Sequence, residues 1–184
     1  KYNPDGIKEW TKLLGTSVWD YGNALTTGSD GAIYIAGHTL GDLDGQTNSG
    51  ESDAFISKYN PDGTKEWTRL LGSSVDDYVN ALTTGSDGSI YIAGSTRGEL
   101  DGQSNSGESD AFISKFSADG EKQWTKLLGS SELDSGGVLA AGIDGAIYVA
   151  GGTEGDLDGQ TNSGDFDAFI SKFSADGEKQ WTKL

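Results

Sequence analysis

Apolar and polar residues follow each other in short runs that predict β-strands and no helix. The run at 32–36 is almost wholly apolar, as expected for a strand covered on both faces, whereas 65–71 mixes charged and apolar residues like a half-exposed outer strand. Glycine in the intervening turns supplies the positive φ that tight turns require. One unit of the pattern therefore has four strands, two short turns and one long polar loop: strands at 23–27, 32–36, 54–59 and 65–71, turns at 29–31 and 60–63, and the loop at 40–53.

This unit recurs with a period of 57 residues. Residues 1–57 and 58–114 are identical at 47 of 57 positions, residues 58–114 and 115–171 at 34, and residues 172–184 copy 115–127 without a change. Four antiparallel strands repeated in tandem are typical of β-propeller blades, whose usual period is about 40–50 residues. The long loop accounts for the excess.

The repeat predicts an all-β fold made of tandem four-stranded antiparallel blades of a β-propeller. The whole chain, 1–184, is one repeat region with no separate second domain. We expect three complete blades and one outer hairpin of a preceding blade: blades at about 23–72, 80–129 and 137–184, and the hairpin at 1–15.

The order of these motifs resembles the bacterial β-propeller repeat family SBBP. The resemblance covers essentially the whole chain and is carried by strand, turn and tryptophan positions in one order: Asp53 to Gly63, Trp67, Leu71-Gly72, Asp76 to Ala81 and Asp87 to Gly94. That family is found in large secreted or surface proteins of bacteria. The resemblance implies an extracellular or cell-surface location and gives no catalytic residues to carry over. The loop at 40–53 is longer than expected for the family.

The net charge of −16 is concentrated at one end of the predicted blades. Because the strands of a blade run alternately up and down, loops 16–22 and 40–53 lie at the same end. We call these two loops, with their equivalents one and two periods later, the long-loop face. It holds 18 of the 29 acidic residues and a single basic one, Arg97. This charge disfavours nucleic acid and anionic membrane surfaces as partners, leaving cations, basic partners or solubility.

The acidic loops are candidate calcium sites, because Ca²⁺ prefers carboxylate, amide and carbonyl oxygens. The competing interpretation is that Asp, Asn, Ser and Gly simply cap and turn the loops, and Thr47 stands where an EF-hand needs its glycine. The candidate ligands lie in loops 40–53, 97–110 and 154–167: Asp42, Asp44, Asp53, Asp101, Asp110, Asp156, Asp158 and Asp167.

Other chemistry is sparse. There is no cysteine, and His38 is the one histidine, so disulfides are impossible and we expect no zinc site. No apolar run approaches the ~18 residues of a membrane-spanning helix, so we expect no membrane insertion. The tryptophans that recur with the period indicate blade packing. Trp19 does not recur, and with Tyr21 it is a candidate for binding a partner, packing over the loop being the alternative.

These observations favour a non-catalytic extracellular repeat module for interaction, adhesion or assembly that displays an acidic loop face. Two alternatives stay open: the propeller part of a polysaccharide-acting enzyme, and a structural subunit of an extracellular fibre. The partner would be a protein, a glycan or a second copy. Since a closed propeller has about 4–8 blades, three blades and a hairpin are expected to self-associate or to belong to a longer protein.

Overall fold

The computed structural model describes all 184 residues and contains strands but no helix. The twelve strands occupy the predicted positions to within a few residues, although the first strand of each unit starts earlier, at Asp20 in the first. Their bounds are β1 Asp20–Thr27, β2 Ile33–Thr39, β3 Asp53–Tyr59, β4 Lys65–Leu71, β5 Asp77–Thr84, β6 Ile90–Thr96, β7 Asp110–Phe116, β8 Lys122–Leu128, β9 Asp134–Ala141, β10 Ile147–Thr153, β11 Asp167–Phe173 and β12 Lys179–Lys183.

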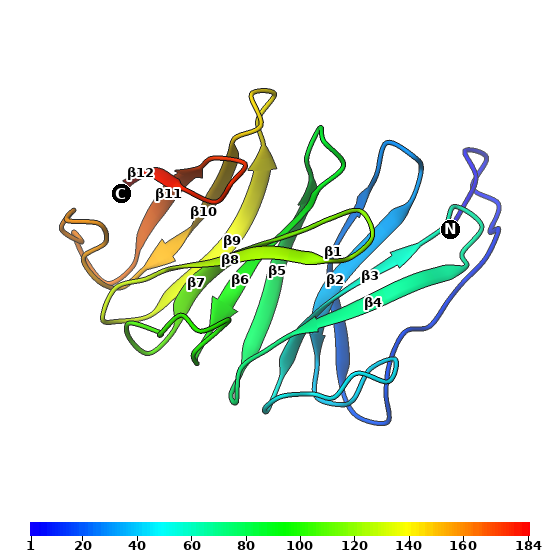
Figure 1. Ribbon diagram of the computed structural model, residues 1–184, viewed down its shortest axis with the longest axis horizontal. Coiled ribbons are helices and arrows are strands. Elements are labelled where there is room, and N and C mark those ends of the chain that lie inside the picture. The colour runs from blue at the N-terminus through cyan, green and yellow to red at the C-terminus, as the bar shows by residue number, and fades with distance from the viewer.

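The strands form three separate four-stranded antiparallel sheets, β1 to β4, β5 to β8 and β9 to β12, which we call blades 1, 2 and 3. The sheets stand side by side, with the two chain termini at opposite ends of the row (Figure 1). The first strands β1, β5 and β9 lie next to each other, whereas the fourth strands do not. The blades therefore converge on their first strands, which confirms the predicted blades of a β-propeller; the three sheets do not close into a ring.

Residues 1–15 form only an incomplete hairpin. A single bridge joins Tyr2 to Lys8, and neither side is long enough to be a regular strand. The segment has no third strand beside it, so most of its backbone groups lack a ladder partner. Trp10 nevertheless packs over Gly63 of blade 1, at the place that the outer strand of a preceding blade would take.

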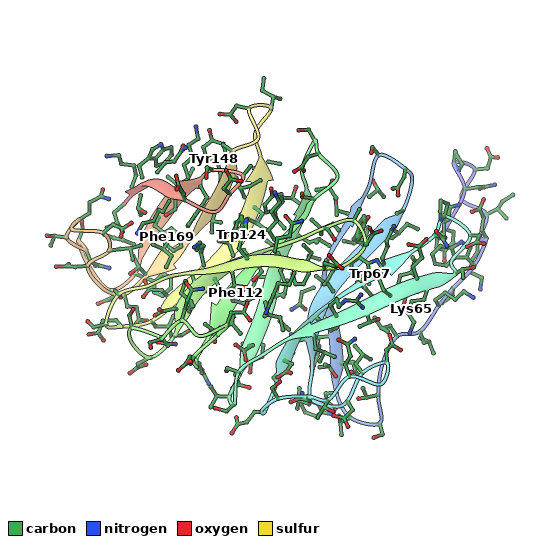
Figure 2. All side chains as sticks on the ribbon, in the orientation of Figure 1. Lys65, Trp67, Phe112, Trp124, Tyr148 and Phe169 are labelled. Atoms are coloured by element: carbon green, nitrogen blue, oxygen red, sulfur yellow. The ribbon has the colours of Figure 1, made fainter.

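Each pair of neighbouring blades encloses one apolar cluster. In blade 1 the residues of this cluster lie on the side toward blade 2, which we call the forward face: Tyr34, Ala36, Ala54 and Ile56. They meet the backward face of blade 2, the side toward blade 1: Val79, Ile90, Ile92, Phe112 and Phe116. The second cluster repeats the arrangement between blades 2 and 3 with equivalent residues, including Phe169. Figure 2 shows Phe112 and Phe169 within the stack of blades.

A bulge in each inner strand links the blades by hydrogen bonds. The register of β1 against β2 shifts between Gly22 and Ala24, so Asn23 stands out of the ladder. Its amide nitrogen donates to the carbonyl of Val79 in blade 2 at 2.7 Å. Asn80 donates in the same way to Gly136 of blade 3 at 3.1 Å. In blades 1 and 2 the bulge thus directs one amide at the next blade, whereas the bulged residue of blade 3 is Gly137.

Candidate functional site

The long loop of each blade folds down against the outer strand of its own blade. Asp44 adopts a positive φ of 52°, and its carboxylate accepts hydrogen bonds from the Lys65 ammonium and the Thr68 hydroxyl of β4. The arrangement recurs in blades 2 and 3: Asp101 with Lys122 and Thr125, and Asp158 with Lys179 and Thr182. Three of the eight candidate calcium ligands are therefore bound to an ammonium and a hydroxyl of the same chain.

A glutamine amide fastens the same loop to the edge of the sheet. Gln46 donates through Nε2 to the carbonyl of Thr68 at 2.6 Å and accepts the backbone N–H of Leu70 at 3.2 Å. Gln103 and Gln160 make the equivalent pairs. The amide replaces a strand partner on the open edge of β4, which protects that edge from pairing with another chain.

Other polar side chains of the loop hold its turns. The Asp42 carboxylate accepts the N–H of Asn48 at 2.9 Å, and the Asn48 amide donates to the carbonyl of Thr39 at 3.0 Å. Asp156 and Asn162 repeat these contacts in blade 3. Side-chain acceptors of this kind stabilise tight turns without any ion.

The blade junctions bury carboxylates. Asp53 at the start of β3 and Asp77 at the start of β5 are fully buried where blade 1 meets blade 2, and the N–H of Asp77 donates to the carbonyl of Ser52 at 2.7 Å. Asp53 accepts the N–H of Ser49 through Oδ2, while its Oδ1 has no hydrogen-bond partner. Asp110 and Asp134 form the equivalent pair between blades 2 and 3. Asp167, in the same position at the uncovered end, is half-buried.

These environments move the carboxyl pKa values in opposite directions. Burial, and then repulsion from Asp77, raise the pKa of Asp53, and burial likewise raises the pKa of Asp77 and Asp110. Burial also acts to raise the pKa of Asp44 and Asp158, but the hydrogen bonds from their lysine and threonine partners outweigh it and hold the pKa below its ordinary value. The raised pKa means that Asp53, Asp77 and Asp110 bind a proton more readily than an ordinary carboxyl, and the lowered pKa means that Asp44 and Asp158 keep their charge more readily.

The structure does not gather the candidate calcium ligands into one cluster. Asp44 and Asp53 belong to the same loop but bind different partners: Asp44 accepts from Lys65, and Asp53 accepts from the N–H of Ser49. No three Asp, Glu or His side chains converge in a way that could hold a metal ion. Several carboxylates of the long-loop face are paired with lysines that our charge count placed elsewhere, or are buried at a junction. The calcium site stays a prediction.

Trp19 and Tyr21 lie at the uncovered end of blade 1. Their side chains are 69% and 45% exposed, and Tyr21 stacks on the half-buried His38 with ring centres 4.8 Å apart. The equivalent of Tyr21 in blade 2, Tyr78, packs edge-on against His38 across the junction, also at 4.8 Å. The exposure of Tyr21 therefore follows from the absence of a blade in front of blade 1, and its role in binding a partner stays a prediction.

Sequence reasoning did not single out the residues that fasten the blades. Asp77 and Asp134 were counted only as charges of the long-loop face, and no role in joining loop to strand or blade to blade was assigned to Gln46 or Asn23. Recurrence at the 57-residue period was the available signal for Gln46 and its equivalents. Recurrence alone does not show that Asn23 is bulged toward the next blade, because the bulge depends on the register of β1 against β2.

Fold and contacts together define a tandem-repeat β-propeller protein whose polar residues mainly join loops to blades and blades to each other. Residues 66–101 match the family model of SBBP, described as a beta-propeller repeat, which confirms the resemblance seen in the sequence. The chain is also 34% identical over 171 residues to the regulatory protein FlaEY of Caulobacter vibrioides. That alignment covers 84% of this chain but 18% of the relative. The chain has no helix long and apolar enough to cross a membrane.

Proposed function

We propose that the chain is a non-catalytic extracellular repeat module that serves interaction, adhesion or assembly. The observation that carries the proposal is the threefold recurrence of the Asp44–Lys65–Thr68 contact, because the acidic groups best placed for chemistry are used identically in every blade. A catalytic pair is a single constellation, whereas repeated contacts serve the fold. The name of the Caulobacter relative, a regulatory protein, agrees with a binding role.

The part of the long-loop face available to a partner is its exposed carboxylates. Five glutamates of this face are exposed and make no ion pair. Glu132 accepts a hydrogen bond from the Ser131 hydroxyl, and the other four are free to attract a basic partner: Glu51, Glu99, Glu108 and Glu154. Clustered charge of one sign raises the association rate with an oppositely charged surface and makes binding sensitive to salt. The proposed partner surface is therefore positively charged.

The test compares two variants that each remove four negative charges. In one, these four glutamates become glutamine. In the control, four exposed carboxylates at the β7–β8 and β11–β12 turns become amides: Asp119, Glu121, Asp176 and Glu178. Binding to a poly-lysine surface is measured at low and high salt. We expect a larger loss for the long-loop variant; equal losses would show that only total charge matters. Release of oligosaccharides from polysaccharide substrates would instead support an enzyme.

A further inference from the structure

The blade junctions bring buried carboxylates together in pairs. A parallel bridge joins Ser52 to Asp76 where blade 1 meets blade 2. Residues that lie opposite each other in such a ladder direct their side chains to the same face, so the next residues along the two segments, Asp53 and Asp77, lie side by side. The charge of Asp77 accordingly acts on the Asp53 carboxyl and raises its pKa. The equivalent bridge between blades 2 and 3 forms a second pair: Asp110 and Asp134.

Both pairs are closed off from solvent. All four carboxylate residues are at most 1% exposed. The main chain packs directly on the carboxylates: a Cβ atom added to Gly72 would stand 2.2 Å from Oδ1 of Asp53, and one added to Gly129 would stand 2.1 Å from Oδ1 of Asp110. Bulk water therefore does not screen the repulsion within a pair.

One oxygen of each paired carboxylate has no hydrogen-bond partner. Oδ2 of Asp77 accepts the N–H and the hydroxyl of Ser73 at 2.5 and 2.8 Å, whereas its Oδ1 accepts nothing. Oδ1 is likewise without a partner in the other three carboxylates, and no basic side chain forms an ion pair with any of the four. Because buried polar atoms are nearly always satisfied, unpartnered oxygens at equivalent places in both junctions point to a ligand.

Asp20 shows how a carboxylate at this position is satisfied when it stands alone. It holds in blade 1 the position of Asp77, but no bridge joins it to a second aspartate. Its Oδ2 accepts the N–H of Thr16 and its Oδ1 the hydroxyl of Thr39, both at 2.6 Å. The equivalent Thr96 hydroxyl lies close enough to Asp77 to lower its pKa but is aligned for the carbonyl of Gly98 at 3.2 Å. The unpartnered oxygen is thus a feature of the paired carboxylates.

The hydrogen-bond donors around each pair favour the charged carboxylates. The N–H of Ser49 donates to Asp53, and the N–H and hydroxyl of Ser73 donate to Asp77; these bonds lower the pKa and oppose the effect of burial. Near neutral pH, two adjacent buried charges then need a cation to offset their repulsion. Ca²⁺ suits such a place, because it binds carboxylate, hydroxyl and carbonyl oxygens in flexible geometry.

We propose that each blade junction binds one Ca²⁺ ion between its paired carboxylates, so that the chain holds two. The ion at the first junction is bound by the Oδ1 atoms of Asp53 and Asp77, and the hydroxyl oxygen of Thr96 is a further candidate ligand. This site differs from a loop site, because its ligands come from two blades. Calcium therefore stabilises the docking of one blade on the next.

The first test counts bound ions per chain by equilibrium dialysis against Ca²⁺. Asp53→Asn together with Asp110→Asn removes one charge from each pair and keeps an acceptor for the loop N–H groups. We expect this junction variant to bind two fewer ions than the wild type. The matched control is Asp42→Asn together with Asp156→Asn, two loop carboxylates that also accept backbone N–H groups, and it should bind as many ions as the wild type.

A second junction variant and thermal unfolding give independent measures. Asp77→Asn together with Asp134→Asn changes the partner of each pair and should lose the same two ions. Ca²⁺ at ~100 times its dissociation constant should raise the melting temperature of the wild type by about 5–10 °C per site above that in NaCl of matched ionic strength. Both junction variants should lack this rise. In chelator the order reverses, because each variant keeps one charge where the wild type has two that repel. Circular dichroism checks that every variant folds.

Three results would overturn the proposal. Absence of calcium binding by the wild type, with stability that responds to pH alone, would show that a proton offsets the paired charges. Loss of the ions by the Asp42→Asn and Asp156→Asn control, with both junction variants unaffected, would assign the calcium to the long loops. An equal rise in melting temperature for the wild type and the junction variants would show that calcium acts outside the junctions.

Discussion

Replacing Gly120 by alanine tests how far the blades depend on tryptophan contacts across the junction. Gly120 has a φ of 80°, and an added Cβ would stand 2.8 Å from the ring of Trp67. Alanine in this left-handed conformation costs about 1–2 kcal/mol. The clash forces the ring or the hairpin to move, and overpacking of this kind costs a further ~1–3 kcal/mol. Gly120→Ala should therefore destabilise the protein by about 2–5 kcal/mol.

Gly88 provides a control for the backbone strain. It lies in the β5–β6 turn of the same blade, has the same φ of 80°, and an added Cβ would have no atom within 4 Å. Gly88→Ala should cost only the ~1–2 kcal/mol of strain. Each kcal/mol lowers the melting temperature of a chain of this size by about 2–4 °C. Denaturant unfolding followed by tryptophan fluorescence and circular dichroism measures both variants, and equal losses would refute the role assigned to the Trp67 contact.

Two further predictions concern the junction amides and the loops. Asn80→Ala removes the hydrogen bond to the carbonyl of Gly136 and should cost about 1 kcal/mol in denaturant unfolding, while an unchanged midpoint would show that the bond contributes nothing. A calcium site in the long loops predicts that Ca²⁺ at ~100 times its dissociation constant adds about 2.7 kcal/mol of stability. The melting temperature should then exceed that in NaCl of matched ionic strength and in chelator; coincident Ca²⁺ and NaCl curves would eliminate the site.

The repeat allowed the sheets to be predicted because every strand is bounded by a recurring local signal. The Asn60–Gly63 turn, for example, fixes the end of β3 and the start of β4 without reference to any distant residue. The first strand was placed too late, at 23 instead of Asp20, because its opening residues are polar and its bulge interrupts the alternation. Local patterns thus located the strands, and their register needed the structure.

The fate of the acidic residues could not be predicted in the same way. Asp44 reaches Lys65 only because its positive φ turns the loop toward the outer strand, and charge counting had assigned these two residues to different parts of the molecule. Asp53 and Asp167 occupy equivalent positions in the repeat, yet one is buried and the other half-buried. The difference depends on whether a further blade follows, which the residues around each aspartate do not encode.

Because three carboxyls are buried at the blade junctions, the free energy of unfolding should decrease as the pH rises. Burial raises the pKa of Asp53, Asp77 and Asp110 in the folded protein above the ordinary 3.8. Between 3.8 and these raised values the folded state binds more protons than the unfolded state, so the free energy of unfolding decreases with increasing pH. Each rise of one in a pKa corresponds to about 1.4 kcal/mol of stability lost across that interval. Asp44 and Asp158, whose pKa is lowered, act oppositely, and their contribution disappears as the pH falls below 3.8.

Asp53→Asn isolates the junction contribution, because asparagine resembles the protonated carboxyl and can still accept the N–H of Ser49. The variant should be more stable than the wild type near pH 7, and its denaturation midpoint should change less as the pH is lowered from 7 toward 3.8. Asp167→Asn is the matched control: the residue occupies the same position and accepts the N–H of Ser163, but no blade covers it. We therefore expect this control to have the wild-type stability near pH 7. If Asp53→Asn destabilises the protein at pH 7, the carboxylate is held there by a favourable interaction, and the argument from burial fails.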